Sequence, residues 1–311
     1  MTRTRHKRRG FSLIELLVVI GIISLLVGLL SPGIRSLTKA ARTLKQKSVL
    51  HGYATGLELF RKDFEDYPPS ELETDAFGTG QTVGGAQHLA EALMGRDIAG
   101  FDPTSRWCDD SENPDVYGPA SMNRRKDPYV VVKDDGVYSL AEVYDVSGGG
   151  NIGNIFSPAV VSGNRAPVMT DIFGRKKVTL VNGERVKAGA PVLYFRADTT
   201  TKRFMGAEPI ANHRQWIYNY RDNRDIIELG TVMDQTVRHK FDTRETTTVD
   251  GTAMDGLAYF YEKLRHPQFR TRDAGGAILS DKPYNPNTFI LISAGWDGIF
   301  GTKDDVTNYN Y

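Results

Sequence analysis

The stretch from Phe11 to Ser31 constrains this chain more than any other, because its 21 residues are almost all apolar and carry one charge, Glu15. As an α-helix rising about 1.5 Å per residue, the stretch is about 30 Å long, which matches the hydrocarbon core of a bilayer. Backbone groups in lipid must be satisfied within the segment, so the stretch predicts a single membrane-spanning helix. Five basic residues precede it: Arg3, Arg5, Lys7, Arg8 and Arg9.

Glu15 is the unusual residue of this stretch, since a carboxylate near the centre of a spanning helix costs roughly 2.5–3.5 kcal/mol. It lies one turn into the stretch, where the cost is lower. It is either a tolerated carboxylate near the membrane interface or one that is paired with a cation. A cut between Gly10 and Phe11 would supply such a cation, because the new α-amino group would lie one turn from Glu15 on the same or a neighbouring chain.

Residues 7–20 resemble the N-terminus of type IV prepilins and of the pseudopilins of type II secretion. The shared features are a basic leader, Gly10, Phe11, a glutamate at the fifth position after the cut, and the apolar stretch. The resemblance implies that a prepilin peptidase removes residues 1–10 and that Phe11 is then N-methylated. It also implies that Glu15 contacts the N-terminus of an adjacent subunit during filament assembly.

An ordinary signal peptide has an apolar core of ~7–15 residues followed by a small-residue cleavage site, so this stretch is too long to be one. Basic residues flank both of its ends, and charge therefore does not fix its orientation. The resemblance implies an inner-membrane protein with its globular part in the periplasm, and it places Pro32 where the family often has a helix-kinking proline. Small residues recur at spacings of three and four within the stretch: Gly21, Ser24, Gly28 and Ser31. They either form a face that lets another helix approach closely or occur there only because Gly and Ser are common in membrane-spanning helices.

The helical pattern continues beyond Pro32 in two sets of apolar residues at spacings of three and four. The first set is Ile34, Leu37, Ala41 and Leu44, and the second is Leu50, Tyr53, Leu57, Phe60 and Phe64. Tyr67-Pro68-Pro69 cannot continue the helix, which should end near Asp66. We therefore expect residues 11–31 to span the membrane and residues 32–67 to form an amphipathic helix whose aromatic face packs on a downstream sheet.

Residues 68–311 predict a globular head, and the fold class of the whole chain is α+β. The resemblance implies a pilin-like fold, in which the long N-terminal helix packs on an antiparallel sheet. Asn182-Gly183 suits the tight turn of a β-hairpin. Strands are expected over 177–186 (as this hairpin), 191–196 and 288–293, and helices over 86–95, 215–229 and 253–264. Residues 71–287 predict a large insertion ahead of the last strand.

Composition excludes several classes of protein. A net charge of +1 argues against nucleic acid as the main partner. A single cysteine, Cys108, excludes an internal disulfide scaffold. The six histidines are scattered, and the motifs of zinc proteases, serine hydrolases and P-loop enzymes do not occur, so the sequence predicts no enzyme.

The C-terminal stretch from Gly295 to Asp305 contains three glycines and three carboxylates. By spacing alone it indicates a solvated acidic turn, and it does not have the EF-hand pattern. Residues 293–308, however, also resemble the C-terminal calcium loop of major pseudopilins. By that resemblance, Ca²⁺ would be bound by the side chains of Asp297, Asp304 and Asp305 and by main-chain oxygens of Ser293 and Ile299. Thr170–Gly174 is loosely similar to an Asp-Pro-Trp-Gly segment of the same family, without its Pro and Trp.

We therefore predict a structural filament subunit, a pseudopilin of the major type in a type II secretion system. Its expected partners are other copies of the chain, other pseudopilins, the prepilin peptidase and methyltransferase, the inner-membrane secretion platform and membrane lipid. Two alternatives remain: a type IV pilin for adhesion or motility, and a membrane-anchored periplasmic enzyme or binding domain, which residues 71–287 keep open. The loop and the single cysteine favour the pseudopilin, since many pilins close their C-terminal region with a disulfide.

Overall fold

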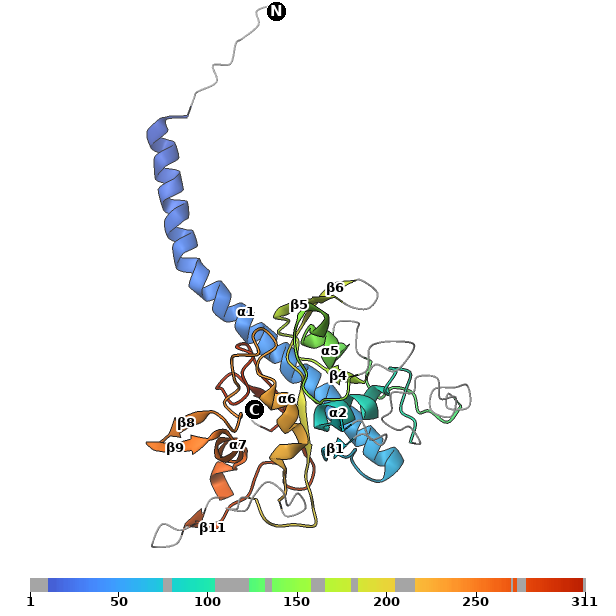
Figure 1. Ribbon diagram of the computed structural model, residues 1–311. Helices are drawn as coiled ribbons and strands as arrows, with labels where there is room; N and C mark the ends of the chain where they lie inside the picture. Colours follow the sequence, from blue (N-terminus) through green and yellow to red (C-terminus); the bar gives the residue numbers. More distant parts are fainter. Residues whose placement is uncertain are drawn as a thin grey trace, which may run out of the picture. The chain divides into compact units, whose positions relative to one another are not determined.

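A computed structural model describes residues 11–74, 80–103, 123–131, 136–157, 166–179, 184–204, 216–269, 271–272 and 278–309. The chain divides into two units, residues 1–44 and 45–311. Helix α1, from Leu13 to Phe64, begins in the first unit and ends in the second (Figure 1). The leader 1–10, Cys108 and the expected hairpin tip at Asn182-Gly183 lie outside the described residues.

In the first unit, α1 continues through Pro32 and exposes its apolar side chains. Three residues of the first periodic set, Ile34, Leu37 and Leu44, are 60%, 71% and 67% exposed. By length and composition the helix could cross a membrane, and its most apolar part is not buried within the chain. An apolar surface of this extent requires lipid or another protein around it, because water solvates it poorly.

In the second unit, α1 buries the second periodic set except for Phe64, which is half-buried. Leu50, Tyr53, Leu57 and Phe60 are each no more than 5% exposed. The helix ends at Phe64, and Glu65 has a left-handed backbone with φ of 65°, ahead of the prolines that follow Tyr67. The predicted end of the helix and its predicted aromatic face are therefore both confirmed.

The central sheet is antiparallel and has the order β13–β12–β7, with β7 at Leu193–Arg196, β12 at Phe289–Ser293 and β13 at Val306–Thr307. Leu291 pairs with Tyr194, and Ser293 pairs with Val306. One face of the sheet packs in a core cluster with α1 and α2 (Gly85–Met94), and the other face packs with α7 (Gly256–Leu264). All five residues of β12 are buried because both faces are covered.

Five short antiparallel pairs surround this sheet in the described part of the chain. The expected hairpin is confirmed by β5 (Lys176–Thr179) and β6 (Arg185–Ala188). The other pairs are β1 (Glu73–Thr74) with β2 (Thr82–Val83), β3 (Val137–Ser139) with β4 (Pro167–Met169), β8 (Thr246–Val249) with β9 (Thr252–Asp255), and β10 (Thr271–Arg272) with β11 (Ile278–Ser280). The remaining helical segments are α5 (Leu140–Val143), η1 (Val146–Gly148), η3 (Tyr220–Asn223), α6 (Arg224–Glu228) and η4 (Pro267–Phe269).

Two expected helices are shorter than predicted. In 215–229 the helical part is η3 followed by α6, because the Asn219 side chain caps a new start through the Arg221 N–H. In 253–264 the first residues belong to β9, and α7 begins at Gly256, where the Asp255 side chain accepts a hydrogen bond from the Ala258 N–H at 2.7 Å. In both places an Asx cap ends one segment and starts the next. The α+β architecture, with a long N-terminal helix and small antiparallel sheets, matches a pilin-like fold.

Candidate functional site

The processing and assembly residues lie at the start of α1. Gly10 lies outside the described residues, while Phe11 is 82% exposed. Glu15 is exposed, and its carboxylate accepts a hydrogen bond from the Ser12 N–H at 3.0 Å. This is the half of a capping box in which the third helical residue reaches back to the cap. The Glu15 carboxylate is thus bound to the backbone of Ser12, the residue next to Phe11. A cut after Gly10 would create an amine on Phe11.

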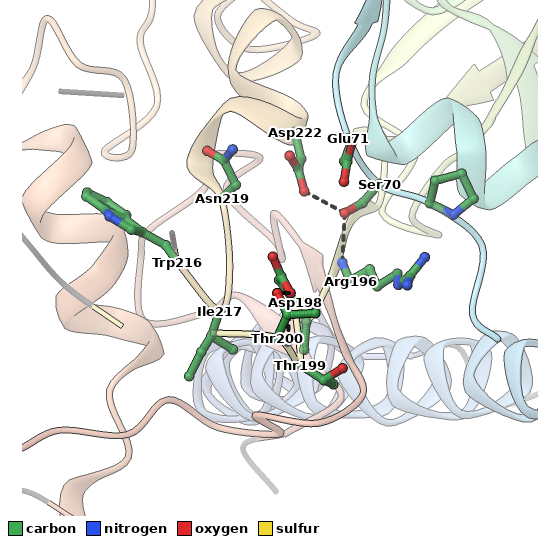
Figure 2. A pocket seen from close by; sticks show the side chains of 12 residues that line it. Ser70, Glu71, Arg196, Asp198, Thr199, Thr200, Trp216, Ile217, Asn219 and Asp222 are labelled. Carbon is green, nitrogen blue, oxygen red and sulfur yellow. Dashed lines mark hydrogen bonds between the residues drawn. The ribbon is translucent and has the colours of Figure 1, made fainter. Parts of the chain in front are cut away.

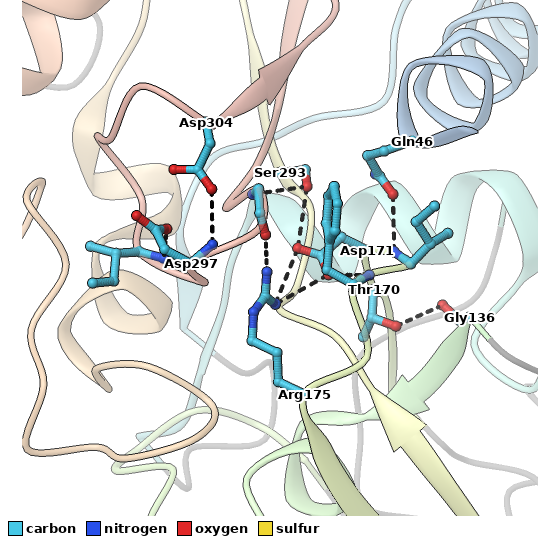
Figure 3. Close-up of polar contacts among 12 residues, drawn as sticks. Gln46, Gly136, Thr170, Asp171, Arg175, Ser293, Asp297 and Asp304 are labelled. Carbon is cyan, nitrogen blue, oxygen red and sulfur yellow. Dashed lines mark hydrogen bonds and ion pairs between the residues drawn. The ribbon is translucent and has the colours of Figure 1, made fainter. Parts of the chain in front are cut away.

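The C-terminal loop joins β12 to β13 and is folded around its own carboxylates. Asp304 accepts a hydrogen bond from the Asp297 N–H at 2.9 Å (Figure 3). It also accepts one from the Thr302 hydroxyl at 2.7 Å. Asp305 accepts one from the Gly301 N–H at 2.8 Å. Gly295 has a φ of 60°, and a Cβ there would overlap the Asp304 carbonyl oxygen, so the loop requires glycine at this position.

The loop is electrostatically unfavourable as it stands. Oδ1 of Asp305 is buried and has no hydrogen-bond partner among the described residues, and burial raises the pKa of this carboxyl well above its usual value. Partial desolvation also raises the pKa of Asp297, and the charge on Asp304 adds to that rise. The hydrogen-bonded Asp297 and Asp304 and the orphaned oxygen of Asp305 are oxygen donors of the kind that Ca²⁺ prefers.

The donor chemistry of the loop therefore fits calcium, although in the part of the chain that the structure describes no three such side chains close around one point. Among the main-chain candidates, Ser293 ends β12 and is buried, and Ile299 donates its N–H to Asp297 Oδ1 at 2.8 Å. Calcium at this loop stays a prediction.

A buried ion pair, which we did not predict from the sequence, is hydrogen-bonded to the C-terminal loop. Asp171 is 2% exposed, and its Oδ1 lies 3.2 Å from Arg175 Nη1. The Arg175 guanidinium also donates to the Gly295 carbonyl oxygen, and the Ser293 hydroxyl donates to Asp171 Oδ2 at 3.2 Å (Figure 3). Burial raises the pKa of Asp171 to about 6, and Arg175 opposes that rise.

The same segment contacts α1 within the second unit. The Ile172 N–H donates to Gln46 Oε1 at 3.0 Å, and Gln46 is fully buried. The 170–174 segment, with Arg175 beside it, therefore connects the helix to the C-terminal loop through hydrogen bonds. The similarity noted for Thr170–Gly174 was the only sequence signal at this position, and the pairing with Arg175 was not among our expectations.

The model of the prokaryotic N-terminal methylation motif matches residues 5–31, which include Gly10, Phe11 and Glu15. Neither a curated protein nor a solved structure matches the chain.

The motif supports a type IV prepilin-like protein, and the long apolar helix with small antiparallel sheets is consistent with a pilin-like fold. The motif supports a precursor of the pilin or pseudopilin kind, and it implies processing by a prepilin peptidase and assembly into pilus-like filaments. It therefore favours a structural subunit over an enzyme. The single apolar helix at the N-terminus is consistent with the membrane anchor of such a precursor.

Proposed function

We propose that this chain is a pseudopilin, a filament subunit of a type II secretion system that assembles in the periplasm. The observation that carries the proposal is the methylation motif, whose apolar part begins a long helix that is exposed there. The C-terminal loop favours the secretion assignment over a type IV pilin, because its sequence resembles the calcium loop of major pseudopilins.

In this proposal the chemistry is assembly. The membrane holds the precursor until the peptidase cuts after Gly10, and the Phe11 amine then becomes available, with or without a methyl group. A cationic amine beside Glu15 of a neighbouring subunit neutralises a carboxylate that is costly in an apolar surrounding. The apolar faces of neighbouring α1 helices cover each other, including the exposed set that begins at Ile34.

Processing and assembly are tested on protein extracted from membranes. The mature protein is expected to begin at Phe11 by mass spectrometry, with a mass increase of one methyl group. Glu15→Gln, which removes only the charge, is expected to be processed normally but to give few filaments by electron microscopy. Glu73→Gln, at an exposed glutamate of β1, is the matched control and should assemble as the wild type does. A protein that still begins at Met1, or normal filaments from Glu15→Gln, would refute the proposal.

We also propose that Ca²⁺ binds the C-terminal loop through Asp297, Asp304 and Asp305, with main-chain oxygens of Ser293 and Ile299. When bound, the ion would neutralise carboxylates that now repel each other and would hold β12 and β13 together. The proposal is supported by the buried, unpartnered Oδ1 of Asp305 and by the raised pKa values of Asp297 and Asp305.

The calcium proposal is tested by the melting temperature of the detergent-solubilised full chain with 1 mM Ca²⁺, Mg²⁺ or EDTA. Calcium, but not magnesium, is expected to raise it. Asp305→Asn should abolish the rise and should melt higher than the wild type in EDTA, because it removes a buried unpaired charge. Asp250→Asn, at an exposed turn between β8 and β9, should keep the calcium response. A wild type that does not respond to calcium contradicts the proposal and leaves the filament assignment untouched.

The secretion assignment is separated from a pilus by deleting the gene in its own host. A pseudopilin is required for export of folded proteins from the periplasm, so these should accumulate there. Loss of twitching motility or adhesion, with export unchanged, would assign the chain to a type IV pilus instead.

A further inference from the structure

The second unit contains a cavity of about 330 Å³, and its lining includes no residue of the C-terminal loop. Figure 2 shows the residues that line it. Three segments line it: residues 69–71 after α1, residues 196–200 at the end of β7, and residues 216–222 before α6. This volume is at the lower end of the range of small-ligand sites. The cavity is formed by described residues, and none of the motifs in the sequence uses it.

A buried carboxylate, Asp222, lines the cavity. The residue is 3% exposed, and its Oδ2 accepts a hydrogen bond from the Ser70 hydroxyl at 2.5 Å. Ser70 in turn accepts a hydrogen bond from the Arg196 N–H at 2.9 Å, so its single proton is committed to Asp222. The other oxygen, Oδ1, is buried and has no partner within the described part of the chain.

The charges around Asp222 are mostly negative. Asp198 and Glu71 also line the cavity. The nearby cation, Arg196, directs its guanidinium to Asp66, at 2.7 Å, and does not pair with Asp222. Burial raises the pKa of Asp222 well above its usual value, and the charge on Glu71 raises it further. An unpaired buried acceptor among acidic groups is costly, and a bound cation would remove that cost.

We propose that this cavity binds an alkylammonium group, a primary amine on an aliphatic chain, with Asp222 Oδ1 as its acceptor. Pro69, Ala197 and Ile217 supply apolar wall for the aliphatic chain. An ammonium is favoured over a guanidinium because Ser70 already occupies the second carboxylate oxygen. A guanidinium binds best with two parallel hydrogen bonds to one carboxylate, whereas an ammonium needs a single oxygen.

A metal ion fits the cavity less well. Calcium requires six to eight oxygen ligands. Among the residues that the structure describes, those of the cavity included, no group of three carboxylate, histidine or cysteine side chains is placed to hold a metal. The lining combines the buried acceptor of Asp222, two further carboxylates at Glu71 and Asp198, and a stretch of apolar wall, which suits an organic amine.

The proposal is tested by calorimetric titration of the detergent-solubilised full chain with n-butylamine, n-butylguanidine and n-butanol, which differ only in the head group. n-Butylamine is expected to bind at least tenfold more tightly than the other two. Asp222→Asn keeps an acceptor for Ser70 and should weaken amine binding at least tenfold. Asp225→Asn, three residues along and outside the cavity, is the matched control and should bind as the wild type does.

Asp222→Asn should melt no lower than the wild type, because the oxygen it replaces has no partner. If that variant does not fold, the double variant Glu71→Gln, Asp198→Asn removes the other two carboxylates that line the cavity. It should weaken the binding of n-butylamine about threefold. Equal binding of n-butanol, no binding of n-butylamine, or unchanged binding by Asp222→Asn would overturn the proposal. Titration with N-acetyl-lysine methylamide tests whether the bound ammonium group belongs to a lysine side chain. Tighter binding of this probe supports a lysine of a partner protein, and tighter binding of n-butylamine supports a free amine.

Discussion

His239 connects two loops of the second unit through a neutral imidazole, and this makes the stability of the protein dependent on pH. The side chain is 1% exposed. Its Nδ1 accepts a hydrogen bond from the Phe300 N–H at 3.0 Å, so Nε2 carries the proton and donates to the Gly230 carbonyl oxygen at 3.1 Å. A second proton on the ring would have to displace the Phe300 N–H.

Burial lowers the pKa of His239 from 6.5 to about 4. The unfolded chain therefore binds more protons between pH 4 and pH 6.5, and in this window stability rises with pH. The stability that the neutral His239 side chain contributes is complete above pH 6.5 and is lost as the pH falls toward 4. The pKa of His239 differs by 2.5 between the unfolded and folded chain, and each pKa unit corresponds to 1.36 kcal/mol. Protonation of His239 can therefore lower the free energy of unfolding by at most about 3 kcal/mol, of which about 2 kcal/mol is lost between pH 7.5 and pH 5.

The measurement is thermal melting of the full chain in detergent at pH 7.5, 6 and 5, for wild type and His239→Gln. Glutamine can keep both hydrogen bonds but does not titrate, so the pH dependence of the variant should lack the histidine contribution. Buried carboxylates such as Asp171 titrate in the opposite sense, and the difference between the two proteins isolates the histidine. His266→Gln, at a partly exposed histidine, should behave as the wild type does. Parallel curves for His239→Gln and wild type would refute the reasoning.

Two further predictions concern packing. Leu57→Ala should lower the free energy of unfolding in urea by about 2–5 kcal/mol, because Leu57 is fully buried between α1 and the sheet. Leu59→Ala, at an exposed leucine of the same helix, should lower it by less than about 0.5 kcal/mol, and equal losses would contradict this packing. Gly85→Ala should destabilise by about 1–3 kcal/mol in the same assay, because the added Cβ would overlap the Tyr194 carbonyl oxygen; an unchanged midpoint would mean that α2 does not approach β7 so closely.

The sequence predicts the elements whose pattern is local and strong. The second half of α1 follows from its three- and four-residue spacing, and β12 follows from its continuous apolar composition. The pair β8–β9 was missed although Asp250-Gly251 is a hairpin signal, and both turn residues have positive φ, at 48° and 81°. The threonine-rich flanks of that turn have little apolar alternation, so periodicity gave no support for the strands.

The first periodic set of α1 shows a different limit. Its spacing is as helical as that of the second set, yet Ile34 and Leu37 are exposed. Hydrophobic periodicity predicts which face of a helix will be covered, and it does not say whether the same chain or another one covers it. In the filament that we propose, a neighbouring subunit would cover this face.

The parts of the candidate sites that depend on distant segments were not predictable from spacing. The loop carboxylates could be named because residues 293–308 resemble the calcium loop of major pseudopilins. The Asp222 cavity could not, because Ser70 and Asp222 are 152 residues apart and neither belongs to a motif. A buried carboxylate is visible only once the fold has removed it from water.

Arg175 offers a test of how the C-terminal loop is held to the rest of the unit. Its guanidinium bridges Asp171, at 3.2 Å, and the Gly295 carbonyl oxygen, and its side chain is 10% exposed. Arg175→Gln should cost about 3–5 kcal/mol at pH 8, because it leaves the Asp171 carboxylate buried without its cation. Arg175→Lys keeps the charge but cannot reach both partners with one ammonium, so about 1–3 kcal/mol is expected.

The double variant Arg175→Gln, Asp171→Asn separates the ion pair from simple packing. If the charge on Asp171 dominates, the double variant should be more stable than Arg175→Gln alone, and the costs of the single changes should not add. Urea unfolding followed by tryptophan fluorescence suits the measurement, because Trp296 lies in the loop with its ring 6.1 Å from that of Phe173. Additive costs would mean that Arg175 acts through its contact with the Gly295 carbonyl and through packing, and that the buried pair contributes no coupling.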